Sequence, residues 1–458
     1  MTNTRSKILG QKDLVLFTVS AVVLLDTLAA SASIGVSSLF WWPFLGVIFL
    51  VPIGLITAEL STAYPSGGGI YVWVRQAFGY RWAARVAWAY WINVAIWLPA
   101  IFVLAIGILS QIVGVEIAIG LQIIVGIACG WLVVGLEFFG LNVSKWVPNF
   151  GAALKFFVFG VLIVMGLRHG LAHGLANELS LQSISPSWQD GIQYLPVIIF
   201  GMLGFELVSS AGDEIKSPRQ TIPVAVLLSG LVTLFLYVFA TFGILAAIPV
   251  GQIDIVEGLI DTFRFLLAEM PASQWIILGL GLATLFSLFA NGAAWAIGAN
   301  RLAAEAASEG QLPSIFAIRS QRHGGPIGAA LVLGCICTGI LFLYGSIATS
   351  NEELFWTLLS FSGVIFMMPY IAMVFAFLKL RTAEPGVTRP FTAPGGSVGA
   401  HAMAAVCVII LLLTIVLFLY VPGDGVQWAT LGGVIAVLTV GEWLIQLGMS
   451  QHRKGAMI

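Results

Sequence analysis

Residues 14–42 read LVLFTVSAVVLLDTLAASASIGVSSLFWW, an apolar stretch long enough to cross a lipid bilayer, with one charged residue, Asp26, near its middle. A membrane helix needs about 20 apolar residues, and a carboxylate at its centre costs roughly 2.5–3.5 kcal/mol on insertion scales. The small residues 29–33 that follow favour an opened helix over a straight, packed one. Two interpretations remain: Asp26 faces a cavity, or it pairs with a neighbouring helix.

The composition predicts a polytopic helical membrane protein. Of the 458 residues, 59% are hydrophobic and 9% are charged, against roughly 25% charged in soluble domains. The mean hydropathy is +1.01. The four cysteines lie in apolar segments, and the five histidines form no cluster on one helix face; His169 and His173 are expected in a glycine-rich loop. We therefore expect no metal, cofactor or nucleic-acid partner, and no enzymatic activity.

Windows of about 20 apolar residues predict twelve transmembrane helices and an all-α fold, because the apolar runs are unbroken rather than alternating. The predicted spans are residues 13–41, 44–63, 82–113, 118–140, 147–167, 192–212, 224–248, 274–306, 328–346, 353–379, 398–421 and 426–448. The low-charge connector within 168–191 is a long predicted loop with room for a short surface helix. No signal-peptide cleavage pattern follows the first span, so we expect it to be retained.

Lys and Arg residues set the predicted orientation, because cytoplasmic loops are enriched in them. Of the 20 basic residues, only Arg168 and Arg264 fall on the side opposite the termini, and Lys155 lies within the fifth span. The termini side carries all the others, including Arg5, Lys7 and the C-terminal Arg453 and Lys454. Acidic residues such as Glu116, Asp254, Glu257, Glu352 and Glu353 fall on the opposite side. Both termini are therefore predicted to be cytoplasmic, in a multi-pass protein of the cytoplasmic (inner) membrane.

Two predicted spans contain helix-disfavouring features at corresponding places of two five-helix halves. The first is residues 25–29 around Asp26. The second is residues 200–206 (FGMLGFE), where Gly201, Gly204 and Glu206 fall at mid-membrane. Glycine costs about 1 kcal/mol in a helix interior, and a buried charge costs more. Paired broken helices of this kind indicate an inverted-repeat transporter with its binding site at the membrane midplane.

Four stretches resemble signatures of the amino acid–polyamine–organocation (APC) transporter superfamily. They are residues 58–79 (AELSTAYPSGGGIYVWVRQAFG), 204–223 (GFELVSSAGDEIKSPRQTIP), 300–313 (NRLAAEAASEGQLP), and Arg389-Pro390-Phe391 with Pro394-Gly395-Gly396. The resemblance implies a leucine-transporter-like 5+5 inverted repeat with broken helices 1 and 6. Its implied parts are a cytoplasmic segment 1–12, a first repeat 13–167, an extracytoplasmic loop 168–191, a second repeat 192–379, peripheral helices 398–448 and a tail 449–458.

The first broken helix departs from the superfamily pattern. Amino acid transporters of the superfamily usually carry a glycine-rich turn there that holds a substrate carboxylate, whereas this chain has Leu25, Asp26 and Thr27. A carboxylate would repel another carboxylate but suits an ammonium group, whose donors need acceptor oxygens. The glutamate/γ-aminobutyrate antiporter branch also lacks the glycine turn. Polyamine transporters of plants and protists carry an acidic residue close to the same point.

The resemblance also implies roles for side chains on other helices. Phe200 and Trp295 match aromatic gates, and Tyr90 matches a gating tyrosine. Tyr370 is the fourth gating residue implied, and it matches a tyrosine that lies near Glu206. The substrate-binding residues implied are Asp26, Thr27, Phe200, Gly201, Gly204, Glu206, Trp295 and Ser362. Packing is the alternative for the aromatic residues, and a buried hydrogen-bonded acid is the alternative for Glu206.

Lys155 matches a lysine that fills the place of sodium in sodium-coupled relatives. It either couples transport to protons together with Glu206 or braces the unwound part of helix 1. Glu137 and Glu442 lack such a match and are expected to be structural.

The sequence thus predicts a secondary transporter that moves small amines, polyamines or amino acids by alternating access, coupled to protons. The alternative is an antiporter that exchanges an amino acid for the amine formed by its decarboxylation. A neutral amino acid exchanger is a third possibility. The oligomeric state is left open.

Overall fold

A computed structural model of the chain describes residues 10–455, with gaps at 66–67, 116, 140–143, 187–193, 208, 210–214, 257, 346–350 and 424. Arg5 and Lys7, two of the basic residues used to predict the orientation, lie outside the described residues. Glu116, Glu257 and part of the 204–223 signature also lie outside them.

The first half of the chain consists of a series of helices, of which the first begins at Gln11. Its elements are α1 (Gln11–Val22), α2 (Leu28–Ala32), α3 (Ser38–Leu45), the π-helical turn η1 (Gly46–Leu50), α4 (Val51–Ala63), α5 (Ile70–Phe78), α6 (Tyr80–Val113), α7 (Ile119–Leu136), the 3-10 turn η2 (Glu137–Phe139), α9 (Trp146–His173) and α10 (Leu181–Ile184).

The second half adds one small hairpin to its helices. Its elements are α11 (Leu195–Phe200), α12 (Pro218–Ala247), the 3-10 turn η5 (Val250–Gln252), α13 (Gly258–Leu267), α14 (Ser273–Ser308), the 3-10 turn η6 (Ser314–Ala317), α15 (Ile327–Gly345), α16 (Asn351–Ala383), α17 (Gly396–Leu419), strands β1 (Tyr420–Val421) and β2 (Gly425–Val426), and α18 (Trp428–Gly455). The two strands pair antiparallel.

Within the described residues, nine helices are long and apolar enough to cross a membrane, and two shorter apolar helices lie at Leu195–Leu207 and Ile327–Leu343. The chain is therefore a polytopic helical membrane protein, as predicted from its composition. The count of twelve spans and the inverted repeat stay predictions.

Both predicted interruptions are confirmed. Helix α1 ends at Val22 and helix α2 begins at Leu28, so Asp26 lies in non-helical chain between them. Helix α11 ends at Phe200 and is followed by a turn and a short 3-10 stretch. Gly204 has φ +117°, a conformation open to glycine and strained for other residues. Each apolar segment thus opens where a charge or a glycine disfavours continuous helix.

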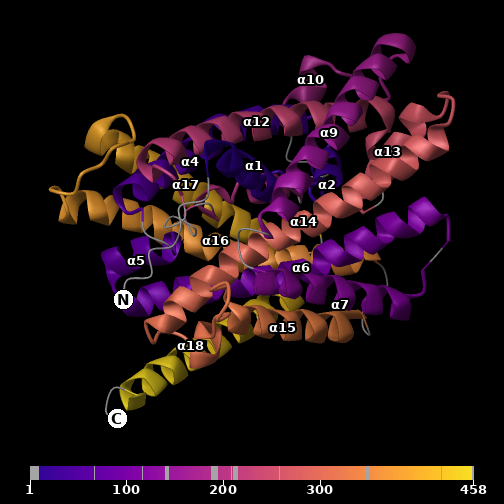
Figure 1. Cartoon of the computed structure of the whole chain (residues 1–458). Helices are drawn as coiled ribbons and strands as arrows, with labels where there is room; N and C mark the ends of the chain where they lie inside the picture. Colours follow the sequence, from indigo (N-terminus) through magenta and orange to yellow (C-terminus); the bar gives the residue numbers. More distant parts are fainter. Residues whose placement is uncertain are drawn as a thin grey trace.

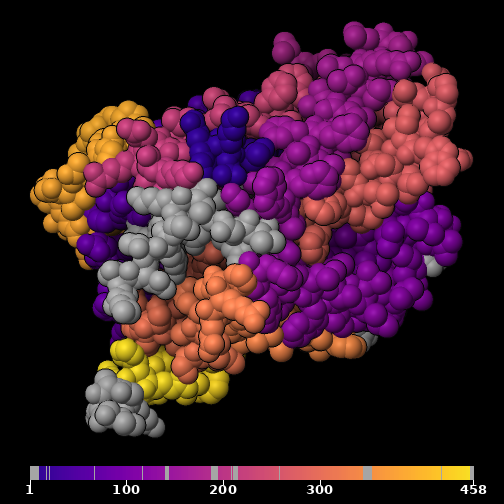
Figure 2. Space-filling view, viewed as in Figure 1, coloured from indigo at the N-terminus to yellow at the C-terminus, as the bar shows by residue number. Residues whose placement is uncertain are grey.

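Helix α6 is the centre of the bundle. It is 34 residues long, and its middle part from Ala83 to Ile108 is almost entirely buried. Helices α14 and α16 pack along it, and Figure 1 shows α14 and α16 running beside α6. In contrast, only 22% of the apolar window of α18 is buried, and its yellow C-terminal part projects from the body of the molecule in Figure 2.

Several predicted boundaries and loops are wrong. The second long helix begins at Ser38 rather than at residue 44, because residues 33–37 already form the turn after α2. The connector 249–273 contains the buried helix α13. Helix α5 occupies half of the predicted connector 64–81, where its apolar side packs on α6 and α16. Helices α5 and α13 have only 9 and 10 residues, so a search for runs of about 20 apolar residues does not find them.

Other corrections concern the predicted outer loop and the two ends of the last span. Helix α9 continues to His173, so His169 and His173 lie on a helix and not in a loop. The short surface helix expected within 168–191 is present as α10, and none of its residues is buried. Helix α18 continues to Gly455, into the predicted tail, and begins after the unpredicted hairpin β1–β2.

Three of the four signature stretches meet in space. The buried Glu59 carboxylate on α4 accepts hydrogen bonds from Arg381 (2.8 and 2.5 Å) and from the Ala393 backbone N–H (2.7 Å), and it lies 3.4 Å from Arg389. Nearby, Tyr71 and Arg75 of α5 both bind Glu309, which follows α14. These contacts link α4 to α16 and α5 to the end of α14, which gives the charged residues of the signatures a structural role.

Candidate functional site

The gap between α1 and α2 holds a buried carboxylate. Asp26 is 1% exposed, its Oδ2 accepts a hydrogen bond from the Trp97 indole N–H (3.3 Å), and its Oδ1 has no hydrogen-bond partner among the described residues. A buried carboxylate with few donors is costly, and besides Trp97 only the Asp26 backbone N–H and the Lys155 charge act on this one, so Oδ1 can accept a further donor.

Side chains from three other helices bind the carbonyl groups at the C-terminal end of α1. The last carbonyls of a helix lack intrahelical partners and carry a partial negative charge. Trp295 donates to Ala21 O (2.9 Å), the Tyr237 hydroxyl donates to Val22 O (3.2 Å), and the Lys155 ammonium donates to Val23 O. The broken end is therefore fixed by α14, α12 and α9.

Lys155 lies in the position that the bracing interpretation requires. Besides Val23 O, its ammonium donates to Asn291 Oδ1 (3.1 Å) on α14, and its charge acts on Asp26. Lys155 is completely buried. The contacts support a fixed cation at the helix end, where the macrodipole favours positive charge. Proton coupling through Lys155 stays a prediction.

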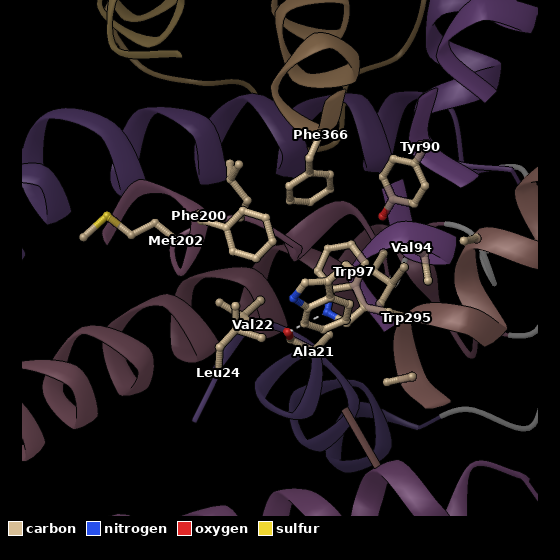
Figure 3. Packing of buried hydrophobic residues seen from close by; sticks show 14 of the residues in the cluster. Ala21, Val22, Leu24, Tyr90, Val94, Trp97, Phe200, Met202, Trp295 and Phe366 are labelled. Atoms are coloured by element: carbon tan, nitrogen blue, oxygen red, sulfur yellow. Dashed lines mark hydrogen bonds between the residues drawn. The ribbon is translucent and has the colours of Figure 1, made fainter. Parts of the chain in front are cut away.

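The aromatic residues predicted as gates form one buried cluster (Figure 3). The Trp295 ring lies 6.1 Å from Tyr90, 5.9 Å from Trp97 and 5.1 Å from Phe366, measured between ring centroids. Phe200 contacts the cluster through Trp97 (6.3 Å) and Phe366 (5.4 Å). Each of these side chains is at most 3% exposed, so the cluster is closed to solvent in this structure.

A second buried carboxylate borders the cluster. Glu206, in the break after α11, accepts a hydrogen bond from the Tyr90 hydroxyl (2.7 Å). The Tyr370 hydroxyl acts on the same carboxylate as a hydrogen-bond partner, and the backbone N–H groups of Gly204 and Glu206 also act on it. The predicted proximity of Tyr370 to Glu206 is thus present.

The remaining predicted residues differ in how closely they join this site. Thr27 is buried beside Asp26, and its hydroxyl is 3.5 Å from Leu24 O. The Ser362 hydroxyl is buried and donates to Leu359 O of its own helix (3.0 Å), and its contact with substrate stays a prediction. Gly201 and Gly204 allow close approach of Tyr237 and Trp295, respectively.

Tyr237 is a site residue that the sequence did not reveal. Its hydroxyl accepts a hydrogen bond from the Leu24 N–H (2.6 Å), and its ring stacks on Trp42 at 4.1 Å. The nearest atom to a Cβ built on Gly201 would be this hydroxyl, at 3.1 Å. Tyr237 therefore contacts both broken helices. A polar aromatic residue within the apolar run LFLYVFATF was the available signal, but it does not say where the hydroxyl points.

Replacing Tyr237 with phenylalanine should lower the free energy of unfolding by about 1–3 kcal/mol, because the buried Leu24 N–H would lose its acceptor. Transport should fall as well, since the opened segment that carries Asp26 would be less fixed. Thermal unfolding in detergent and uptake into vesicles measure the two effects. Tyr420→Phe, at an exposed tyrosine on β1, is the control; equal behaviour of the two variants would contradict the bracing role.

Replacing Gly204 with alanine should abolish most transport. The residue would have to adopt φ +117°, and its Cβ would lie 2.9 Å from the Trp295 ring and 3.3 Å from Val22. Such strain costs about 1–3 kcal/mol and would displace either the break or the tryptophan. Gly160→Ala, where a Cβ meets nothing within 4 Å, is the matched control. Normal uptake by both variants would show that the break does not need glycine.

The acidic and histidine residues that the sequence analysis did not assign to the site have partners outside it. Buried Glu137 accepts a hydrogen bond from Asn300 (3.2 Å), and half-exposed Glu442 pairs with Arg85. The rings of His169 and His173 stack at 5.0 Å. No group of three or more His, Cys, Asp or Glu residues suited to a metal occurs among the described residues.

Comparison with known proteins decides the family. The sequence profile of a family described as "Amino acid permease" matches residues 9–441, nearly the whole chain. The chain belongs to the amino acid permease family. This finding confirms the resemblance to the APC superfamily, and it makes the broken helices and the enclosed cluster part of a membrane transporter.

Several curated relatives in this permease family are similar over most of their length. A probable agmatine/putrescine antiporter of Lactococcus lactis subsp. lactis is 32% identical over 403 residues, covering 88% of this chain and 86% of the relative. A glutamate/gamma-aminobutyrate antiporter of the same organism is 23% identical (79% and 73% covered). A polyamine transporter of Oryza sativa subsp. japonica is 25% identical (81% and 67% covered).

Proposed function

We propose that this permease carries small cationic amines across the membrane by alternating access and that Asp26 binds the substrate ammonium. The observation that carries the proposal is the buried Asp26 carboxylate, with one oxygen held by Trp97 and the other without a partner among the described residues. An ammonium group supplies the missing donors and the opposite charge. A substrate carboxylate would meet repulsion at the same place.

The aromatic cluster supports a cation rather than a neutral substrate. Trp97 binds Asp26, and its ring lies 6.3 Å from Phe200 and 5.9 Å from Trp295 between centroids. Aromatic ring faces attract a cation by about 0.5–2 kcal/mol each when it is desolvated. The names of the agmatine/putrescine and polyamine relatives agree with such a substrate. Because the cluster is closed to solvent here, substrate entry requires another conformation.

The mode of coupling has two candidates. Proton coupling is proposed for Glu206 and Lys155, two ionisable groups at the cluster and at the broken helix end. Exchange of one substrate for another is the second candidate, favoured by two relatives that are named antiporters. In both cases Asp26 serves as the binding residue, and we place the termini in the cytoplasm because of the distribution of Lys and Arg.

Uptake of radiolabelled putrescine into proteoliposomes tests the proposal. Vesicles are preloaded with putrescine, with an amino acid or with buffer alone, and an imposed proton gradient is added in a parallel series. Uptake into buffer-loaded vesicles that depends on the gradient supports proton coupling, whereas uptake only into preloaded vesicles supports exchange. Failure to take up putrescine, agmatine and related amines under all conditions would refute the proposed function.

A further inference from the structure

A cavity of about 260 Å³ lies between α6, α16 and α18, outside the candidate site. Its rim carries an ion pair, because Arg85 of α6 binds Glu442 of α18. The two side chains are 39% and 40% exposed, so both can accept a further partner. The Arg85 guanidinium also lies over the Trp82 ring, 4.8 Å from its centroid. The rest of the lining is mostly apolar.

The charged rim lies near one surface of the membrane. Helix α6 begins at Tyr80, and both Tyr80 and Trp82 are more than half exposed (53% and 54%), as aromatic residues at a membrane interface commonly are. The lining residues of α6 run from Trp82 to Ala89, which is about 10.5 Å along the helix axis at 1.5 Å per residue. The cavity therefore extends from the interface into the hydrocarbon region.

Helix α18 follows the same order from charge to apolar surface. Arg85 meets Glu442, and Trp88, one turn further along α6, donates to Val437 O (3.0 Å), so α6 and α18 run antiparallel. Leu438, one turn before Glu442, therefore lines the deeper part of the cavity. Charged groups thus stand at the membrane surface and apolar groups stand below them.

The deep end of the cavity adjoins the candidate site. Ala89 of α6 and Pro369 of α16 line the cavity. The residues that follow them, Tyr90 and Tyr370, both act on the Glu206 carboxylate. A molecule in the cavity would pack against the two helix segments that position these tyrosines.

The surrounding membrane supplies a molecule of this shape and charge. Only 22% of the apolar window of α18 is buried, so lipid covers much of this helix. A guanidinium such as that of Arg85 binds a phosphate through two parallel N–H···O bonds. A primary ammonium beside the phosphate has three N–H donors for the Glu442 carboxylate. An acyl chain gives the apolar lining the contacts that an empty void lacks.

We propose that this cavity binds a phospholipid whose head group carries both a phosphate and a primary ammonium. The phosphate binds Arg85, the ammonium binds Glu442, and one acyl chain fills the cavity. A head group without an ammonium meets the negative charge of Glu442, and a trimethylated head group offers no N–H donor. The proposal goes beyond the proposed function, because it concerns a second ligand and does not depend on which substrate is carried.

Native mass spectrometry of the purified, delipidated full chain tests the site without any variant. The probes are dioleoyl phosphatidylethanolamine, phosphatidylcholine and phosphatidylglycerol, and soluble phosphoethanolamine, which is the head group alone. The parent should bind phosphatidylethanolamine about tenfold more tightly than the other two lipids, the usual size of a hydrogen bond to a charged group. Affinities for the three lipids within about twofold of one another would overturn the proposal.

Phosphoethanolamine separates a lipid from a soluble ligand of the same chemistry. Because it cannot fill the cavity, it should bind at least about tenfold more weakly than phosphatidylethanolamine. Equal affinity would show that the site recognises a free head group, and the lipid site would be refuted.

Two substitutions test the location of the bound lipid. Glu442→Gln removes the charge that attracts the ammonium, so it should abolish the preference for phosphatidylethanolamine over phosphatidylglycerol. Ala372→Phe adds a ring to the cavity lining without changing either charge, and it should weaken phosphatidylethanolamine binding about tenfold through overpacking. Ala405→Phe, at an exposed position of α17 outside the cavity, is the matched control and should bind like the parent.

The variants also give results that contradict the proposal. If Glu442→Gln keeps the preference for phosphatidylethanolamine, Glu442 does not bind the ammonium. If Ala372→Phe binds this lipid as tightly as Ala405→Phe, the acyl chain lies elsewhere. Melting temperatures in detergent show whether each variant is folded, and amine uptake is not needed for any of these measurements.

Discussion

The Asp26→Asn variant is expected to lose amine transport while the chain stays folded. Asparagine has nearly the same shape, and its side-chain oxygen can still accept the hydrogen bond from Trp97. It removes the negative charge that the proposed ammonium needs. Loss of one partner of a buried charge pair costs 2–5 kcal/mol or more, so affinity should fall by about 30-fold or more.

Binding by calorimetry and uptake into proteoliposomes measure this effect, and the melting temperature in detergent reports whether the variant folds. The matched control is Asp261→Asn on α13, where the acid is 43% exposed and pairs with Arg264 at 3.5 Å. That substitution should leave uptake unchanged. If Asp26→Asn binds its amine as tightly as the parent, Asp26 is not the ammonium-binding residue.

The Glu59→Gln variant is expected to show the largest loss of stability. Glu59 is 2% exposed and faces two guanidinium groups, those of Arg381 and Arg389, whose side chains are 15% and 12% exposed. Removing the carboxylate charge would leave both cations poorly compensated. Breaking a buried ion pair in this way costs about 3–5 kcal/mol.

Thermal unfolding of purified Glu59→Gln in detergent checks this prediction. Asp261→Asn again serves as the control, because its half-exposed ion pair with Arg264 should contribute about 0–1 kcal/mol. A melting temperature for Glu59→Gln within the scatter of that control would show that the contacts between the signature stretches do not hold the bundle together.

The sequence predicted the two helix breaks because the physical signals are local. A carboxylate inside an apolar stretch, or two glycines three residues apart, disfavours helix without reference to any neighbour. The sequence did not predict two short helices, because no comparable local signal marks them. Helices α5 and α13 are too short for a membrane window, and they are stabilised by packing on other helices, which a linear pattern does not contain.

Contacts within the candidate site were harder to predict. Trp97 is seven residues after Tyr90, a spacing that places both on one helix face, but nothing local says that it reaches Asp26. Asn291, the second partner of Lys155, lies one turn before Trp295 on α14. The contact of Tyr237 with Leu24 joins residues 213 positions apart. Such partners follow from the packing of α6, α12 and α14 around the break.

The most direct test is an experimental density map of the full chain with putrescine bound. We predict a broken first helix, with one ammonium nitrogen about 3 Å from an Asp26 carboxylate oxygen, within the cluster of Trp97, Phe200 and Trp295. An uninterrupted helix over residues 11–32, or putrescine bound with both nitrogens remote from Asp26, would contradict the account.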